Sequence, residues 1–169
     1  MPACPDGTTL ATPVGPLSLL ADADGMLHAA GFTARPQDLL SRPDGAWRRC
    51  GELGAVTRAL RAYLDGDVEA IGMLAVAQPG GGFVQAARAA MRAIPAGTTL
   101  TYRELAARAG RPAAVRAAGS ACAGNRIALV VPCHRVLRSD GSLGGFLWGL
   151  PVKRWLLEHE RRHAAARAA

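Results

Sequence analysis

The sequence predicts a mixed α/β protein with a small N-terminal α/β domain and a mainly helical C-terminal domain. The second domain is expected to contain a helix-turn-helix and a short strand that leads into the loop holding Cys133. Three observations support this prediction: residues 17–30 alternate in strand fashion around a turn, segments after residue 82 keep helical spacing, and Pro79 precedes three glycines. We therefore expect domains over residues 1–80 and 81–169, with a linker near residues 78–82.

The first elements are a hairpin and a helix. Apolar residues alternate over residues 17–21 and 26–30 on either side of Asp24-Gly25, which predicts two antiparallel strands. Residues 33–51 are rich in Pro, Gly and Arg and show no clear period. Helical spacing returns before Asp65-Gly66 at Leu53, Val56, Leu60 and Leu64.

Three helices are expected between residues 84 and 125. The first ends before Pro95. The second opens with the capping box Thr101-x-x-Glu104 and closes at Gly110, and the third opens near Pro112 and closes at Gly124-Asn125. The short junction between the last two predicts a helix-turn-helix.

The second helix of this pair consists mostly of Ala and Gly, with Arg116 as its one long polar side chain. Such a helix is poor in groups that read bases in the major groove. It favours close approach to a narrow groove, where Arg116 would fill the place of an extruded nucleotide. Tight packing between helices is the alternative explanation of the small residues.

The segment after these helices raises a chemical question. Ile127, Leu129 and Val131 read as a buried strand, yet Pro132 stops the pairing and is followed by Cys133 and His134. The last helix, after Pro151, is expected to face inward with Trp155, Leu156 and Leu157.

Composition limits the class of protein. With 169 residues, half of them apolar, the chain is not disordered, and its apolar runs are too short to span a membrane. The N-terminus lacks the pattern of a signal peptide, so we expect a cytoplasmic protein. The cysteines show no regular zinc spacing and are expected to be free thiols: Cys4, Cys50, Cys122 and Cys133.

Charge is distributed unevenly along the chain. Residues 1–80 hold six basic and nine acidic residues, net −3, whereas residues 81–169 hold fourteen basic and four acidic residues, net +10. Clustered arginine favours a polyanionic partner through counterion release. A solvated basic surface is the alternative.

Adjacent residues on an extended chain point to opposite faces, so His134 would reach the Cys133 thiol through a bridging water. The imidazole could then take the thiol proton if a carboxylate fixed its tautomer. Of the four carboxylates after residue 80, Glu160 on the last helix is the favoured partner. Taken alone, a cysteine beside a histidine is more often accidental than catalytic.

The motif "PCHRV", preceded by "GN" and followed by "GFLWGL" and "KRWLLEHE", resembles the O6-alkylguanine-DNA alkyltransferases, which repair DNA by direct reversal. The N-terminal "TPVGPLSLLADADG" and "LRAYLDGD" are similar to the first domain of that family. The resemblance implies that Cys133 accepts the alkyl group, His134 is the water-linked base and Glu160 the orienting acid. It also implies that Asn125 braces the turn, and that Tyr102 and Lys153 assist departure of the guanine oxygen.

The resemblance further implies two sets of binding residues. DNA contacts are expected from Tyr102, Arg103, Ala114, Arg116, Gly119 and Ser139. The substrate pocket is expected to be formed by Cys133, Val136, Phe146, Leu147 and Trp148, with the carbonyls of Cys133 and Val136 reading the base amine. Leu147 replaces a small or polar residue of many members and can offer only its backbone N–H, and Trp148 is expected to narrow the pocket.

The expected reaction is single-turnover transfer of an alkyl group, chiefly methyl, from O6 of guanine, and also O4 of thymine, to Cys133. The expected partner is double-stranded DNA with alkylated bases, without sequence preference; no membrane, no cofactor and a monomer are implied. No metal site is expected, because Ala23 stands where the family's zinc pattern has a cysteine near His28. The alternatives are a non-catalytic alkylated-DNA binding protein on the same fold, whose known members lack the cysteine, and a cysteine hydrolase.

Overall fold

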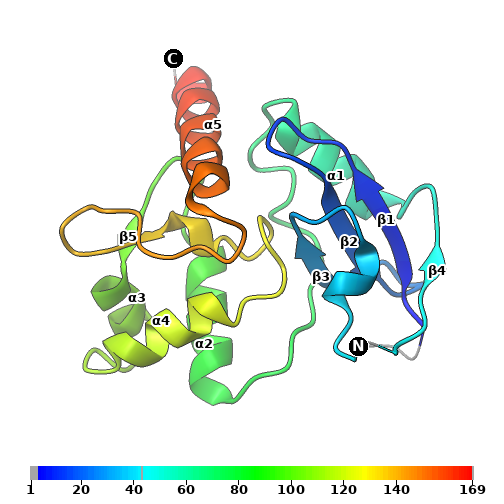
Figure 1. Ribbon diagram of the computed structural model, residues 1–169. Helices are drawn as coiled ribbons and strands as arrows, with labels where there is room; N and C mark the ends of the chain where they lie inside the picture. The colour runs from blue at the N-terminus through cyan, green and yellow to red at the C-terminus, as the bar shows by residue number, and fades with distance from the viewer. Residues whose placement is uncertain (1–3, 43, 169) are drawn as a thin grey trace. The chain divides into compact units, whose positions relative to one another are not determined.

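The computed structural model describes residues 4–42 and 44–168, which divide into two compact units (Figure 1). The first unit consists of the residues up to Gln78 together with a second segment, Arg126–Val130. The second unit consists of Pro79–Asn125 and the residues from Val131 onward. The prediction of a mixed α/β fold is confirmed. The return of residues 126–130 to the first unit had no signal in the sequence.

A four-stranded sheet of order β3-β2-β1-β4 forms the first unit. The predicted hairpin is β2 (Leu17–Ala21) and β3 (Leu27–Gly31), which pair antiparallel. All five residues of β2 are buried, because this strand lies inside the sheet. The free edge of β3 is partly covered by single bridges to Val76 and Ile127.

Two strands of this sheet were not predicted. β1 (Asp6–Leu10) pairs antiparallel with β2, and the two-residue β4 (Arg48–Arg49) pairs parallel with β1. Gly7 on β1 lies under the Trp47 ring, since a Cβ there would be 2.7 Å from Cε3 of the indole. A 3-10 helix, η1 (Pro36–Leu39), stands between β3 and β4.

The predicted helix of the first unit is α1 (Ala55–Leu64), which lies next to the sheet (Figure 1). Its buried residues include Val56, Leu60 and Tyr63, spaced four and three apart as on one helical face. Leu64, which was expected to share this face, is only half-buried. The helix ends at Asp65, as predicted from Asp65-Gly66.

Helices dominate the second unit. α2 (Gly82–Arg92) is followed by the two-residue β5 (Leu100–Thr101), α3 (Tyr102–Arg108) and α4 (Val115–Ala123). The capping box is present: Thr101 Oγ1 accepts from Glu104 N at 3.2 Å, and a Glu104 carboxylate oxygen accepts from Thr101 N at 2.7 Å. α3 and α4 thus form the predicted helix-turn-helix, and α2 packs against both.

The apolar run over residues 127–131 is not the regular strand that was expected. Only Ile127 forms a bridge, to Ala30, and residues 128–130 turn. Leu129 adopts a φ of 67°, a conformation that interrupts a strand. All five residues are nevertheless buried, so the apolar pattern reported burial correctly and conformation wrongly.

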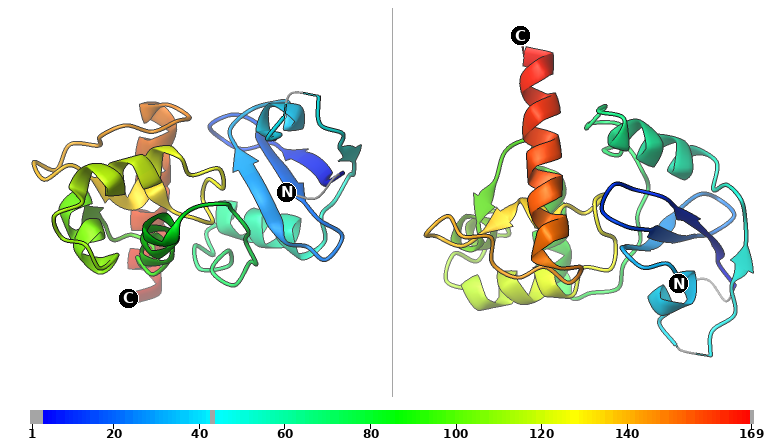
Figure 2. Two further views of the ribbon diagram at one scale, coloured as in Figure 1. Left: turned by 90° about the horizontal axis from the view of Figure 1, so that it is seen from below. Right: turned by 45° about the horizontal axis from the view of Figure 1, so that its top comes forward.

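The chain ends in α5 (Leu150–Ala168), whose C-terminal turns extend beyond the rest of the second unit (Figure 2). The expected inward face of three consecutive residues is wrong, because neighbours on a helix lie 100° apart. Trp155 and Leu157 are only half-buried. The buried face is formed by Val152, Lys153, Leu156, His159 and Glu160. No helix in the described part of the chain has the length and apolar composition to cross a membrane.

Candidate active site

Cys133 begins a one-turn 3-10 helix, η2 (Cys133–Arg135), directly after Pro132. The chain here is turned and not extended: Arg135 N donates to the Pro132 carbonyl at 3.0 Å, and Cys133 N to the Val131 carbonyl at 2.8 Å. η2 leads into β6 (Val136–Leu137), which pairs parallel with β5. The thiol is therefore held on a rigid turn with 9% of the residue exposed.

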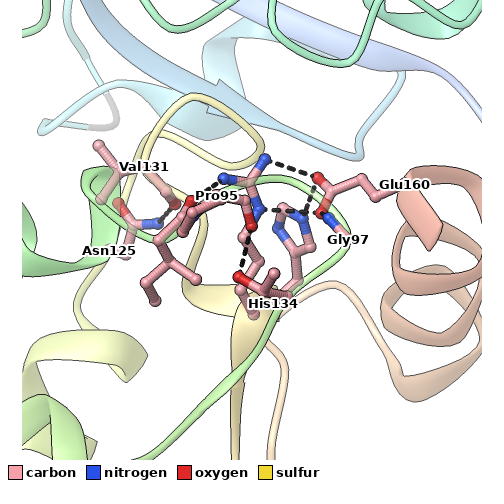
Figure 3. A network of polar contacts seen from close by, with 9 residues as sticks. Pro95, Gly97, Asn125, Val131, His134 and Glu160 are labelled. Atoms are coloured by element: carbon pink, nitrogen blue, oxygen red, sulfur yellow. Dashed lines mark hydrogen bonds and ion pairs between the residues drawn. The ribbon is translucent and has the colours of Figure 1, made fainter. Parts of the chain in front are cut away.

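Asn125 contacts the sulfur directly. Its Nδ2 donates to the Val131 carbonyl at 2.7 Å (Figure 3). It also donates to Cys133 Sγ at 3.2 Å, and the residue is buried. The expected bracing of the turn is thus accompanied by a contact that the sequence did not indicate. A donor to sulfur favours the thiolate over the thiol.

Behind the turn, His134 and Glu160 form a fully buried pair. Glu160 reaches from α5 so that His134 Nε2 and Glu160 Oε1 lie 2.7 Å apart (Figure 3). His134 Nδ1 is also buried, and it makes no hydrogen bond with any described residue. The carboxylate therefore fixes the orientation of the ring through one nitrogen and leaves the other for a further partner.

Arg135 completes this group, and its role was missed from the sequence. Its Nε donates to Glu160 Oε2 at 2.8 Å, its Nη2 to Oε1 at 2.9 Å, and its Nη1 to the Ile94 carbonyl. Gly97 N donates to Oε2 at 3.5 Å. Gly97 has a φ of 77° and lies so close to α5 that a Cβ would be 2.8 Å from Ala164 Cβ.

Burial opposes ionisation of Glu160, but the charges and hydrogen bonds of His134 and Arg135 outweigh it and hold the pKa of this carboxyl well below its ordinary value. A buried arginine is usually paired with an acid. The basic residue Arg135 in the "PCHR" motif was the one feature of the sequence that could have indicated a second partner for Glu160.

The Cys133 thiol is governed by competing effects. Burial raises its pKa, while the hydrogen bond from Asn125 and the positive charge of Lys153 lower it without overcoming burial. Burial also raises the pKa of the neighbouring Cys122 to about 12. Burial therefore favours the thiol form of both groups.

Lys153 is fully buried on α5, and backbone carbonyls surround its ammonium group. Nζ donates to Val136 O at 2.7 Å, to Leu143 O, and to Gly145 O at 3.4 Å. Burial lowers its pKa. Lys153 therefore ties the loop after β6 to the last helix and also supplies a positive charge that acts on Cys133.

Cys133 lies at a cavity of about 280 Å³ in the second unit. Its lining includes four of the expected pocket residues and two expected DNA contacts; the full set is Tyr102, Gly119, Cys122, Ala123, Asn125, Cys133, Gly145, Phe146, Leu147 and Trp148. Leu147 is 66% exposed, whereas Trp148 is half-buried. The cavity is large enough to admit a small planar group, and its wall is mainly apolar and aromatic.

Three residues that line the cavity were not predicted there: Cys122, Ala123 and Gly145. Gly144, next to Gly145 in the loop after β6, was not predicted at the site either. Gly144 has a φ of 66°, and a Cβ there would be 2.9 Å from the Tyr102 hydroxyl oxygen, so glycine allows the loop to pass over the phenol. Burial raises the pKa of Tyr102, which keeps the phenol protonated as a donor. Cys122 lines the cavity with its Sγ 3.9 Å from Met91 Sδ.

The remaining predicted residues lie outside the cavity lining. Val136 is fully buried, with its carbonyl bound by Lys153. Arg103 on α3, Arg116 on α4 and Ser139 in the turn after β6 are exposed, and Ala114 is the N-cap residue of α4. Exposed side chains on the helix-turn-helix are free to meet a large partner.

Comparisons with known proteins show which family this chain is similar to. Residues 82–162 match the family described as "6-O-methylguanine DNA methyltransferase, DNA binding domain". A methylated-DNA–protein-cysteine methyltransferase of Salmonella typhimurium is 39% identical over 158 residues, covering 89% of this chain and 92% of the relative. One from Methanosarcina barkeri is 34% identical over 152 residues, covering 90% and 94%.

Solved structures extend the similarity to the fold. The crystal structure of Mycobacterium tuberculosis OGT in complex with DNA has a TM-score of 0.78 and 32% sequence identity, covering 94% of each chain. O6-methylguanine-DNA methyltransferase from Pyrococcus kodakaraensis shares the fold with a TM-score of 0.67 at 20% identity. Because these similarities cover nearly the whole chain, including the turn that carries Cys133, the chain belongs to the methylated-DNA–protein-cysteine methyltransferase family.

Proposed function

We propose that this protein repairs alkylated DNA by direct reversal, with Cys133 as the acceptor of a methyl group from O6 of guanine and also from O4 of thymine. The observation that carries the proposal is the position of the Cys133 sulfur at the cavity, with Asn125 on the sulfur and the buried group of His134, Glu160 and Arg135 behind it. An isolated structural cysteine requires none of these partners.

The reaction follows from the chemistry of these groups. His134 takes the thiol proton through a water molecule held at Nδ1, and Glu160 stabilises the imidazolium. The thiolate attacks the alkyl carbon, so an S–C bond forms and the C–O bond to guanine breaks. The guanine leaves as its amide form after accepting a proton, for which the Tyr102 hydroxyl at the cavity is the donor. The proton that His134 took from the thiol goes to solvent, and the Tyr102 phenolate regains a proton from solvent, so both groups return to their starting forms.

The product is a thioether, which has no good leaving group. The cysteine is therefore consumed, and each molecule acts once and needs no cofactor. A cysteine hydrolase, in contrast, forms a thioester that water cleaves. Because burial raises the pKa of Cys133, the thiol needs the base His134 to yield the attacking thiolate.

Double-stranded DNA is the proposed partner. The protein binds it as a monomer and without sequence preference. The helix-turn-helix presents α4, whose small residues suit close approach to the minor groove, and residues 81–169 carry a net charge of +10. Arg116 would occupy the space left by the extruded alkylated base. The exposed Arg103 and Ser139 would contact phosphates, and Ala114 and Gly119 would allow close approach.

The test is incubation with duplex DNA carrying O6-methylguanine, followed by intact-protein and peptide mass measurement. We expect one added methyl per protein, on the peptide that holds Cys133, and no turnover with excess DNA. Cys133→Ser should abolish transfer and keep DNA binding, since the basic surface remains. Repeated turnover would support a hydrolase, and DNA binding without methylation would support a non-catalytic binder.

A further inference from the structure

Arg88 on α2 is a buried cation with an unusual set of partners. The residue is 8% exposed, and its Nη1 donates to the Pro79 carbonyl at 2.6 Å and its Nη2 to the Gly124 carbonyl at 3.1 Å. Among the described residues no carboxylate acts on its charge, and its Nε has no hydrogen-bond partner. A buried charge held only by backbone carbonyls is costly, so its contacts require an explanation.

The Gly124 contact lies at the end of α4. Gly124 is the C-cap residue of that helix, and its carbonyl has no partner within the helix. A positive charge at a helix C-terminus is favourable, because the carbonyl dipoles point toward it. Arg88 thus fixes the direction of the last carbonyl of α4.

That carbonyl belongs to the same peptide group as the N–H of Asn125. Because the peptide group is planar, a fixed Gly124 carbonyl also fixes the backbone from which the Asn125 side chain starts. Asn125 Nδ2 is the donor 3.2 Å from Cys133 Sγ and 2.7 Å from the Val131 carbonyl. The residue that Arg88 contacts and the residue that donates to the sulfur are therefore joined by one peptide bond.

The Pro79 contact holds the segment before α2 at the same point. Gly80 lies so close to the guanidinium that a Cβ would be 3.1 Å from Nη1 and 2.9 Å from Val84 Cγ1. One turn further along α2, Met91 contacts Cys122 in the last turn of α4. Arg88 and Met91 thus hold the end of α4 from one helical face.

We propose that Arg88 is a positioning residue for Cys133: through the Gly124 carbonyl it orients Asn125, and Asn125 in turn stabilises the thiolate. This inference rests on the proposed function of Cys133 as the alkyl acceptor. Without the guanidinium the Gly124 carbonyl loses one restraint, and the Gly124–Asn125 peptide is held through the hydrogen bond from Asn125 N to the Cys122 carbonyl at 3.2 Å. The peptide can then tilt about that bond, which lengthens the contact between Nδ2 and Sγ and raises the free energy of the thiolate.

The test uses the full-length protein and iodoacetamide, which measures the thiolate independently of DNA repair. The Cys133 sulfur forms a bond to the reagent carbon, iodide leaves, and the thiol proton goes to solvent. The rate is followed on the Cys133 peptide by mass spectrometry between pH 6 and pH 10, in the parent and in Arg88→Met, Arg88→Lys and Arg154→Met. Arg154 is an exposed arginine on α5 and serves as the matched control.

We expect Arg88→Met to slow modification at pH 7 by about fivefold and to shift the pH profile upward, as for the loss of one hydrogen bond to a charged group. Arg88→Lys should restore part of the rate, because one ammonium can reach one of the two carbonyls. Arg154→Met should match the parent. A parent-like profile for a folded Arg88→Met overturns the proposal, and if that variant unfolds, Arg88→Lys with a parent-like profile overturns it.

A double-mutant cycle with Asn125→Ala separates positioning from a general loss of packing. If Arg88 acts through Asn125, adding Arg88→Met to Asn125→Ala leaves the pH profile of Cys133 unchanged. An equal upward shift in both backgrounds would contradict the proposed route. Methyl transfer from O6-methylguanine DNA is measured in parallel: a parent that fails to transfer methyl refutes the proposed function, while the iodoacetamide arms still decide the role of Arg88.

Discussion

The Glu160 carboxylate binds two basic side chains at the site, His134 and Arg135. Its Oε1 is shared by His134 Nε2 and Arg135 Nη2, and its Oε2 accepts from Arg135 Nε. Arg135 keeps the carboxylate ionised, so it is available to stabilise a proton on His134. The same contacts link the stability of the fold to pH.

We predict that Glu160→Gln is less stable than the parent at pH 7 by about 3–5 kcal/mol, because Arg135 is left buried without its acid. The folded-state pKa of Glu160 lies below its ordinary value of 4.5, so its stabilisation is present above that value and is lost as the pH falls. The variant should therefore show a flatter dependence of the unfolding free energy on pH below about 4.5. Urea unfolding between pH 7 and pH 3 measures both effects.

Glu158→Gln is the matched control for this prediction. Glu158 is exposed on the same helix and pairs with Arg161 and Arg162 on the surface, where ion pairs contribute little. The prediction also requires slower methyl transfer for Glu160→Gln than for Glu158→Gln. Equal transfer rates for the two variants would remove Glu160 from the proton relay.

Trp148 lines the same cavity as Cys133. If its indole limits the space beside Cys133, then Trp148→Gly should react faster than the parent with free O6-benzylguanine, while transfer of methyl changes little. A misplacement of about 1 Å can cost on the order of a hundredfold in rate, so the gain for benzyl should exceed tenfold. Inactivation kinetics with both substrates measure it, and no gain for benzyl would mean that Trp148 does not gate the cavity.

At the scale of elements, the loop between β6 and α5 is held from two sides. From α5, Lys153 Nζ donates to two carbonyls of the loop, those of Leu143 and Gly145, and to the Val136 carbonyl of β6. On the other side, Gly144 passes close to the Tyr102 hydroxyl. The loop supplies Gly145, Phe146, Leu147 and Trp148 to the cavity. Its conformation therefore decides the shape of the site.

We predict that Gly144→Ala slows methyl transfer by about tenfold or more, because the new Cβ would displace the Tyr102 phenol or the loop from its position. Gly141→Ala is the control: Gly141 has a φ of 81°, but a Cβ there meets nothing within 4 Å. Both variants carry the cost of a left-handed alanine, about 1–2 kcal/mol. The midpoint temperature of thermal unfolding should therefore fall in both variants, whereas the rate of methyl transfer should fall only in Gly144→Ala. Equal transfer rates in the two variants would exclude the Tyr102 contact as the cause.

Another element-scale prediction concerns α4. Arg116→Ala should weaken repair of duplex DNA more than transfer from free O6-benzylguanine, since only the duplex needs a side chain in the vacated stack. The two substrates are compared in the same protein preparation, so any loss of folded protein affects them alike. Equal losses would argue against insertion of Arg116 into DNA.

The elements also show what the sequence could predict. The start of α3 and the end of α4 were predicted because Thr101, Glu104 and Gly124 act locally, whereas α4 begins at Val115 and not near Pro112 as expected. β1 was missed, and residues 127–131 were assigned as a strand, because their conformations depend on distant partners and on the φ of Leu129. Tertiary contacts decide both.

The candidate site divides in the same way. Cys133, His134 and Glu160 were found from residue type and position, and the structure brings the last two within 2.7 Å. The second partner of Glu160, the Asn125 contact to sulfur and the carbonyls around Lys153 depend on how η2, α4 and α5 pack together. The sequence shows Arg135 beside His134, but no local pattern specifies which groups these side chains contact.

For the whole molecule, the charge of the second half predicts how DNA affinity responds to salt. Residues 81–169 have a net charge of +10 and the exposed α4 offers few base-reading groups. Affinity for undamaged duplex DNA should fall by at least tenfold between 50 and 200 mM salt, and it should vary less than about fivefold among sequences. Fluorescence anisotropy with several duplexes measures both, and a strong preference for one sequence would contradict non-specific phosphate contact.

The buried pair of His134 and Glu160 also has a consequence for how the protein is made. A ribosome synthesises Cys133 and His134 first and reaches Glu160 on the order of seconds later. Until α5 is complete and packed, the histidine has no acid behind it, and the sulfur lacks the charge of Lys153, which lies on the same helix. A nascent chain, or a fragment released before α5, therefore carries Cys133 as an ordinary thiol without the burial that raises its pKa in the folded protein. Its sulfur is open to stray alkylating agents, although the chain lacks the base and the charge that the folded site supplies for repair.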